Sequence, residues 1–165
     1  VYDAKGNCLV QKEYDYIDGD FDGKVTYVYD AYANCIKESR YYSSGGLWST
    51  MIRKFDSKGN CIEECEYDSD GKLNRRNTST YDFSGNGIEY NSYDSDGNLE
   101  YKIIGSYDSN GNCIEQTWFS SNGEPIGKNI LSYDSSGNVV ELKSYRYKGR
   151  VTVPKEKHYA YIALA

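Results

Sequence analysis

The sequence predicts an all-β protein, an antiparallel meander of repeated β-hairpins that forms an open, twisted or curled single-layer sheet. Two sets of aromatic residues support this. The first recurs every 26 residues, with Tyr2 one residue out of step, at Tyr29, Phe55, Tyr81, Tyr107, Tyr133 and Tyr159. The second follows each member by 12 residues, at Tyr14, Tyr41, Tyr67, Tyr93, Phe119 and Tyr145. A fixed period of this length indicates a repeat protein whose units cannot bury apolar surface alone.

A turn motif after each aromatic is the third observation, and residues 107–115 show it best. The aromatic is followed by Asp, two small or polar residues and a glycine. The Asp side chain can hydrogen-bond the backbone ahead of it, and the glycine can take the left-handed conformation of a type I turn with a bulge. Ten turns have this glycine: Gly6, Gly45, Gly59, Gly71, Gly85, Gly97, Gly111, Gly123, Gly137 and Gly149.

Taken in order, the predicted hairpins begin at Gly6 and continue to the last repeat. The second turn is irregular, since Gly19 sits one residue late, and the third has Ala33 in place of glycine. Between turns run seven to nine residues rich in Tyr, Ile, Val, Thr and Ser, which favour strands. Residues 151–165 keep Tyr159 in phase without the turn motif, so they either cap the last edge or continue the sheet. About a dozen short strands are expected.

The register of these hairpins predicts two different faces. If Asp108 faces Asn112, then Tyr107 faces Cys113, and alternation puts both aromatic columns on one face. That face also takes a cysteine column and a leucine column and is the expected core. The opposite face carries one apolar column, Leu9, Ile36, Ile62, Ile88, Ile114 and Val140.

A β-solenoid, in which each repeat forms one coil, is the alternative architecture. In a meander, the cysteines at 8, 35 and 61 lie on every second strand, roughly 9 to 10 Å apart. A solenoid would bring them to about one strand spacing, where disulfides become possible. Free thiols that pack under the tyrosines therefore favour the meander, and a metal site of four cysteines lacks the usual CxxC spacing.

Composition indicates a thin core. The chain has 165 residues, of which 19 are tyrosine, and its mean hydropathy is −0.78. Tyrosine stacks along a sheet while its hydroxyl tolerates water. An open sheet of this size exposes edges and an apolar stripe, which favours curling, further repeats or a partner, including self-association through the tyrosine face.

The repeat pattern predicts one domain, residues 1–165, with six 26-residue repeats from Tyr2 and a partial repeat from Tyr159. The chain begins at Val1 in the middle of a repeat, so we expect a fragment of a longer protein. The net charge is −6 and the pI is about 4.9, which makes nucleic acid and anionic membranes poor partners. No apolar run is long enough to insert into a membrane.

The motif resembles a known repeat family. Segments YDSNGNCIEQ (107–116), YDSSGNVVEL (133–142), FDSKGNCIEE (55–64) and YDSDGKL (67–73) resemble the YD, or Rhs-type, repeats of bacterial surface and secreted proteins. The likeness covers nearly the whole chain, which is a divergent example because its repeat alternates 12 and 14 residues. The resemblance implies a β-strand shell or stalk that carries or encloses another module, at a bacterial surface or outside the cell. It implies no catalytic residues.

An acidic insertion between Tyr14 and Tyr29 breaks the period. Asp18, Asp20 and Asp22 precede Gly23 in the pattern of the first half of a calcium loop. The second half is missing, since Tyr29 stands where such a loop has a bidentate Glu. The alternatives are a calcium site, with calcium as the only cofactor the chain suggests, or a longer acidic turn.

Enzymatic activity is not expected. His158 is the only histidine and lies in the degenerate last repeat, so a serine or cysteine triad has no base. Aspartate and glutamate recur at turn positions in every repeat, which indicates a structural role rather than a glycosidase pair.

Two functions remain open. The first is a non-catalytic scaffold that binds a protein partner. The second is a carbohydrate-binding module for a cell-surface glycan, with Trp48 and Trp118 as candidate stacking residues on the face opposite the tyrosine columns. These tryptophans could instead only shield the isoleucine column. A glycan site should be a local, irregular cluster, whereas a scaffold should look alike in every repeat.

Overall fold

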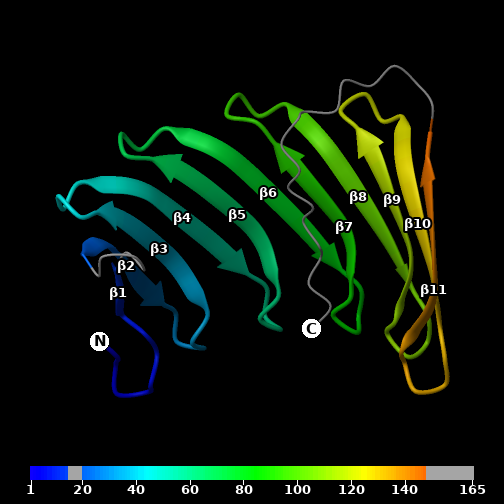
Figure 1. Cartoon of the computed structure of the whole chain (residues 1–165), viewed down its shortest axis with the longest axis horizontal. Coiled ribbons are helices and arrows are strands. Elements are labelled where there is room, and N and C mark those ends of the chain that lie inside the picture. Colours follow the sequence, from blue (N-terminus) through cyan, green and yellow to red (C-terminus); the bar gives the residue numbers. More distant parts are fainter. Residues whose placement is uncertain (15–19, 148–165) are drawn as a thin grey trace. The chain divides into compact units, whose positions relative to one another are not determined.

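The structure, a computed structural model, describes residues 1–14 and 20–147. These residues form strands and turns without helices (Figure 1). The strands are β1 (Val10–Tyr14), β2 (Phe21–Tyr29), β3 (Cys35–Tyr42), β4 (Leu47–Phe55), β5 (Cys61–Asp68), β6 (Leu73–Tyr81), β7 (Gly87–Tyr93), β8 (Leu99–Tyr107), β9 (Cys113–Ser120), β10 (Pro125–Tyr133) and β11 (Val139–Arg146).

The strands follow one another in sequence order as an antiparallel meander, from β1 to β11. Each registered pair, such as β8 with β9, is antiparallel. The predicted meander is confirmed, and the solenoid alternative is wrong for the described residues. In this part of the chain we find no helix with the length and apolar character needed to cross a membrane.

The turns have the predicted geometry. In the hairpin after β8, the Asp108 N–H donates to the Asn112 carbonyl at 3.0 Å and the Gly111 N–H donates to the Asp108 carbonyl at 3.1 Å. Gly111 has a φ of 85°, which side chains disfavour. The same pair of backbone bonds recurs around Gly6, Gly45, Gly59, Gly71, Gly85, Gly97, Gly123 and Gly137. Ala33 adopts the conformation too, at a φ of 67°.

An extra residue next to each turn changes the predicted faces. Tyr107 pairs with Cys113 as expected, but Ser106 pairs with Glu115, so Ile114 has no partner. This β-bulge reverses the alternation of side chains along the strand. Tyr107 and Phe119 therefore lie on opposite faces, and the expectation that one face collects both aromatic columns is wrong. The bulge leaves only a weak signal in the sequence, because an extra residue inside a strand does not change the 26-residue period.

We name the two faces by their aromatic columns. Each 26-residue repeat has two halves, the first beginning at an aromatic of the first set and the second at an aromatic of the second set. Face 1 carries the first-half aromatics Tyr29, Phe55, Tyr81, Tyr107 and Tyr133, together with the cysteines beside them. Face 2 carries the second-half aromatics Tyr41, Tyr67, Tyr93, Phe119 and Tyr145. These assignments follow from the strand registers and the alternation between them, and Tyr93 is placed on face 2 by the Arg76 guanidinium over its ring.

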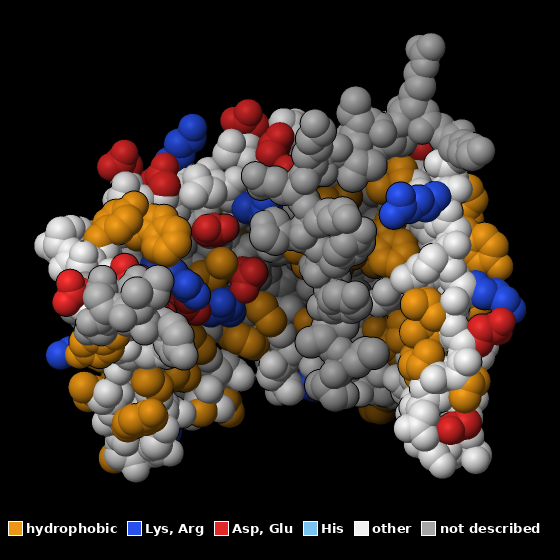
Figure 2. All heavy atoms as spheres, viewed as in Figure 1, with side chains coloured by type: hydrophobic (Ala, Val, Ile, Leu, Met, Phe, Trp, Pro, Cys, Tyr) orange, Lys and Arg blue, Asp and Glu red, His pale blue; other side chains and the backbone are white. Residues whose placement is uncertain are grey.

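Contacts divide the chain into two compact units, Val1–Thr78 with Ser92–Asn98, and Ser79–Asn91 with Leu99–Ala165. Each has little buried apolar surface. Val25 in the first unit and Ile103 and Cys113 in the second are 2% exposed, and all three lie on face 1. On the side visible in Figure 2, hydrophobic and charged side chains alternate in small groups. The predicted thin core is confirmed for the described residues.

Three tyrosines of face 1 are tied to a backbone carbonyl of the neighbouring chain segment. The Tyr107 hydroxyl donates to the Gly87 carbonyl at 3.0 Å, and Tyr29 and Tyr133 do the same to Cys8 at 3.0 Å and Cys113 at 2.8 Å. Burial raises the pKa of Tyr107 to about 12. The chain approaches closely here, because a Cβ on Gly105 would lie 3.0 Å from the Gly87 carbonyl oxygen.

Three aromatics of face 2 are instead covered by cations. The Lys24 ammonium lies 4.8 Å from the centre of the Tyr41 ring, and the Lys102 ammonium lies 5.4 Å from that of Phe119. The Arg76 guanidinium carbon lies 5.3 Å from the centre of the Tyr93 ring. A cation over an aromatic face is attracted by the ring quadrupole.

All five cysteines, at 8, 35, 61, 65 and 113, are free, which agrees with the meander geometry. Burial raises the pKa of the Cys35, Cys61 and Cys113 thiols. The predictions for Gly19, Gly149, His158 and the partial repeat 151–165 lie outside the described residues.

Candidate binding surface around Trp48

Trp48 is exposed beside a second exposed aromatic. It is the extra residue of a bulge, since Tyr41 pairs with Leu47 and Arg40 pairs with Ser49. Its ring stacks on that of Tyr42, with centroids 6.0 Å apart and an interplanar angle of 25°. Trp48 is 54% exposed and Tyr42 is 52% exposed. Ring pairs that remain this accessible can take a flat apolar ligand surface.

The turn between these two rings explains their arrangement. Tyr42 occupies the position that Asp has in most turns, and its N–H donates to the Gly46 carbonyl at 2.9 Å. A Cβ on Gly46 would approach the Tyr42 ring at 3.8 Å, an ordinary contact. The departure from the Asp motif therefore places an aromatic, rather than a carboxylate, next to Trp48.

A hollow of about 300 Å³ lies beside the pair, within the first compact unit. Strands β3, β4 and β5 supply its lining, which is Glu38, Arg40, Trp48, Ser49, Met51, Arg53 and Glu66. The register places Met51 between Glu38 and Glu66, all on face 1. The hollow thus combines an aromatic wall with fixed charged groups.

Ion pairs hold these charged groups in place. Arg40 donates from Nε to Glu38 Oε1 at 2.9 Å, and Arg53 Nη2 lies 3.4 Å from Glu38 Oε2. Arg53 Nε also pairs with Glu64 Oε2 at 2.8 Å. The Glu38 side chain is 14% exposed and that of Arg53 is 20% exposed, so the pairs are partly desolvated. They preset the geometry of the polar wall.

The pKa of Arg53 reflects this environment. Burial alone would lower it, but the hydrogen bond to Glu64 and the charges of Glu64 and Glu38 raise it above its ordinary value. Arg53 therefore stays charged. Both Glu38 oxygens face guanidinium groups.

Trp118 occupies a different setting, in the second compact unit. It lies on face 1 between Ile103 and Gly127 and is half-buried. A Cβ on Gly127 would lie 3.9 Å from the Trp118 ring, and Ile103 is 2% exposed. Trp118 therefore shields Ile103. The expectation that it lies opposite both tyrosine columns is wrong, because the bulges put the first-half tyrosines on its own face.

Sequence reasoning found Trp48 but missed its companions. No recognisable sequence motif contains Tyr42 or the ion-paired residues Glu38, Arg40 and Arg53. One signal was available, since Tyr-Tyr-Ser-Ser-Gly-Gly at 41–46 is a turn without the usual Asp.

The calcium prediction stays a prediction. Asp18 lies outside the described residues, whereas Asp20 and Asp22 are described. Within the described ranges, no group of three or more His, Cys, Asp or Glu side chains is placed to hold a metal ion.

No family model matches this chain, and no curated protein matches it. Solved structures with some likeness include a porin-like protein from Bacteroides uniformis, with 16% identity over 83% of this chain, 55% of that chain and a TM-score of 0.46. A Tc holotoxin pore from Photorhabdus luminescens has 12% identity, coverage of 84% and 9%, and a TM-score of 0.35. A TcdB2–TccC3 structure has the same values.

This chain thus spans about half of the porin-like chain and 9% of the toxin chains. At TM-scores below 0.5 these likenesses carry no functional argument.

Proposed function

We propose that this chain is a non-catalytic scaffold, a stalk or shell segment of a YD-repeat protein that is secreted by a bacterium or held at its surface. In this role it presents a sheet face to a protein partner. The observation that carries the proposal is the repetition of one set of contacts: the Asp-Gly turn, the bulge beside it and the tyrosine hydroxyl on a neighbouring carbonyl.

The recurring contacts support a structural role because they satisfy groups of the chain itself. The turn aspartates accept hydrogen bonds from their own turn, as Asp108 does from Asn112. The surface also mixes both charge signs with exposed aromatics, as expected of a protein-binding face rather than a nucleic-acid-binding one. A non-catalytic role agrees with the engagement of Glu38 by two arginines.

Deletion of one repeat tests the scaffold. Removal of residues 108–133 joins Tyr107 to Asp134 and keeps the turn motif in register. We expect the shortened chain to keep its β-type circular dichroism and a cooperative thermal transition, because each repeat contacts only its neighbours. As a control, a second variant lacks 13 residues, which is half a repeat. The proposed repeat scaffold would be overturned if the full-repeat deletion unfolds the chain and the half-repeat deletion is no less stable.

An epitope inserted into the exposed turn at 94–98 tests the location. In the parent protein, antibody should label intact bacteria or the culture medium. Labelling only after lysis contradicts the proposed site of action.

A glycan-binding function is the second candidate, and the irregularity of the Tyr42–Trp48 pair favours it. The position of Trp48 is taken by Asn74, Glu100 and Ile126 in the following repeats. Exposed rings stack on sugars, and the Glu38 and Arg53 side chains offer partners for hydroxyls. A glycan array should show binding that Trp48→Ala abolishes and Tyr32→Ala, at a residue that is 88% exposed, leaves intact. Equal signals from both variants would remove this candidate.

A further inference from the structure

We propose that the hollow beside Tyr67 on face 2 binds a lysine or arginine side chain of a protein partner. The incoming cation takes the place that other repeats fill from their own chain. This inference rests on the proposed scaffold function, because it specifies which chemistry on a partner the sheet face recognises.

The other repeats supply the template. One position of face 2 recurs every 26 residues and holds a cation in four repeats, at Lys24, Arg76, Lys102 and Lys128, with Thr50 at this position in the remaining repeat. The register pairs Lys24 with Tyr41, Lys102 with Phe119 and Lys128 with Tyr145. At three places the cation lies over the ring, within 4.8 to 5.4 Å of its centre. Distances below about 6 Å are typical of cation–π contacts.

Thr50 breaks this column. It pairs with Tyr67 in the register, but its side chain is short and neutral, and its Oγ1 lies 3.3 Å from Ser39 Oγ. Neighbouring cations of this face are engaged elsewhere. Arg76 covers Tyr93 and pairs with Glu63 at 2.6 Å, and Lys54 also pairs with Glu63. Tyr67 is therefore the aromatic of this column that pairs with a neutral residue instead of a cation.

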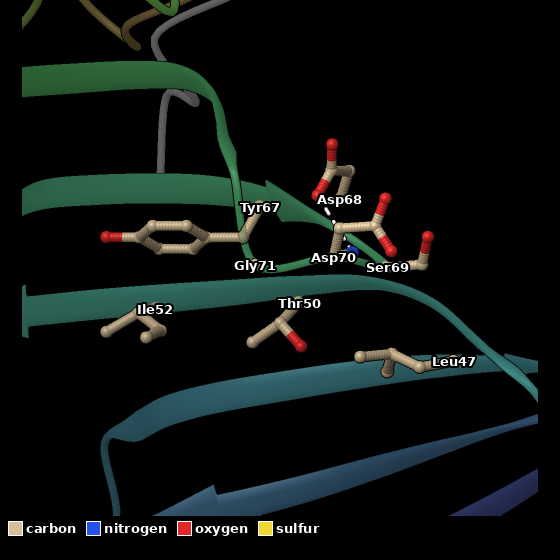
Figure 3. A pocket seen from close by; sticks show the side chains of 8 residues that line it. All are labelled: Leu47, Thr50, Ile52, Tyr67, Asp68, Ser69, Asp70 and Gly71. Carbon is tan, nitrogen blue, oxygen red and sulfur yellow. Dashed lines mark hydrogen bonds between the residues drawn. The ribbon is translucent and has the colours of Figure 1, made fainter.

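A hollow of about 410 Å³ lies where that cation is missing (Figure 3). Its lining consists of Leu47, Thr50, Ile52, Tyr67 and the turn residues Asp68, Ser69, Asp70 and Gly71. Figure 3 shows the Tyr67 ring alongside Thr50 and Ile52, with the turn at one end. Ile52 is 40% exposed. The alkyl stem of a lysine or arginine can pack on such apolar side chains while its head reaches the ring and the carboxylates.

The charge at this end of the hollow favours a cation. In most turns an Asn side chain donates to the second oxygen of the Asp, as Asn112 does to Asp108 Oδ2. Lys72 replaces that Asn after Asp68, and among the described residues the donors are the backbone N–H groups of Asp70 and Lys72, both to Asp68 Oδ1. Asp68 Oδ2 thus remains available to a ligand, and Asp70 is exposed beside it. A chain with a net charge of −6 also favours a basic partner.

The test uses n-butylammonium chloride as a probe of the lysine head and stem, at constant ionic strength, with n-butanol as the neutral control. We expect saturable amide chemical-shift changes at Thr50, Tyr67 and Asp70 with the ammonium and not with the alcohol. Thr50→Lys restores the missing cation and should weaken the binding of the probe at least tenfold. Equal shifts with both probes, or unchanged binding to Thr50→Lys, would overturn the inference.

A gain-of-function variant guards against a folding defect in Thr50→Lys. Arg76→Thr removes the cation over Tyr93, where Asp94 and Asp96 follow the ring as Asp68 and Asp70 follow Tyr67, and should create a second site, with new shifts at residue 76 and Tyr93. An Arg76→Thr chain that folds and gains no site contradicts the inference. Either failure leaves the scaffold proposal to the repeat-deletion test, which does not depend on ammonium binding.

Discussion

The two halves of the repeat use the same turn backbone for different purposes. In the first half, Asp and Asn close the turn with side-chain bonds, and the tyrosine hydroxyl is tied to a neighbouring carbonyl. In the second half, the rings of Tyr41, Tyr93 and Phe119 lie under a cation. The turn residues vary there, although Asp94 and Asn98 keep the Asp–Asn pair. Where the first half has Asp and, four residues later, Asn, the second half has Asp68 with Lys72, Ser120 with Glu124 and Tyr42 with Gly46.

First-half turns also lie against one another, which restricts their residues. The Asn34 side-chain oxygen is 3.6 Å from the Cβ position of Gly59, and Asn86 is equally close to that of Gly111. Second-half turns at Gly45, Gly71, Gly97 and Gly123 have open space at that position. The difference teaches that the first half holds the repeats together and the second half is free to diverge. Both hollows, at Trp48 and at Tyr67, border second-half turns.

Acid should produce the largest effect, because six first-half turns share one device. Hydrogen bonds from the Asn side chain, and then from the backbone, lower the pKa of the turn carboxyl, as Asn112 does for Asp108. The first-half carboxylates with this shift are Asp3, Asp30, Asp56, Asp82, Asp108 and Asp134, and Asp94 shares it in one second-half turn through Asn98. Their stabilising contribution is full above the unfolded pKa of about 3.9 and is lost as pH falls through the lower folded values.

Thermal unfolding between pH 7 and pH 2 measures this loss. Asp108→Asn should flatten the decline of Tm below pH 4. Lys72→Asn should steepen it, because it gives a second-half turn the Asp–Asn pair of the first half. An unchanged profile in both variants contradicts the proposed contrast between the halves.

Removal of a tyrosine hydroxyl should separate the halves next. Tyr107→Phe leaves the Gly87 carbonyl without its donor and should cost about 1 kcal/mol of unfolding free energy. Tyr93→Phe, on the opposite face under Arg76, should change stability by less than about 0.5 kcal/mol. Urea unfolding compares the two variants, and equal losses would show that both halves depend on the hydroxyl.

The cation column should give the smallest effect. Lys102→Ala removes the cation over Phe119 and should destabilise the chain by about 0.5 kcal/mol. Thr50→Lys should stabilise it by a similar amount, since it adds the contact that its repeat lacks. Urea unfolding at low and high salt checks both, and the difference should shrink in high salt. A stabilising effect of Lys102→Ala would argue against the cation–ring contact.

The amino-acid sequence by itself determined the repeated hairpin. The Asp-x-x-Gly motif requires a turn with a left-handed residue, and the motif at Tyr107–Asn112 predicts both the Tyr107–Cys113 pair and the Asp108–Asn112 bond that the structure has. These features are local, because a few consecutive residues supply every group involved. The meander follows, since short turns join antiparallel neighbours.

Only the tertiary structure decided which side chains share a face. The unpaired Ile114 and Trp48 reverse the alternation, and a bulge forms through pairing between strands, which no single segment records. The same holds for both hollows. Tyr42 stacks on Trp48 across a turn. Tyr67 lacks the cation of its column because β4 and β5 align it with Thr50. Sequence spacing predicts the strands, but the contacts between strands determine what each face presents to a partner.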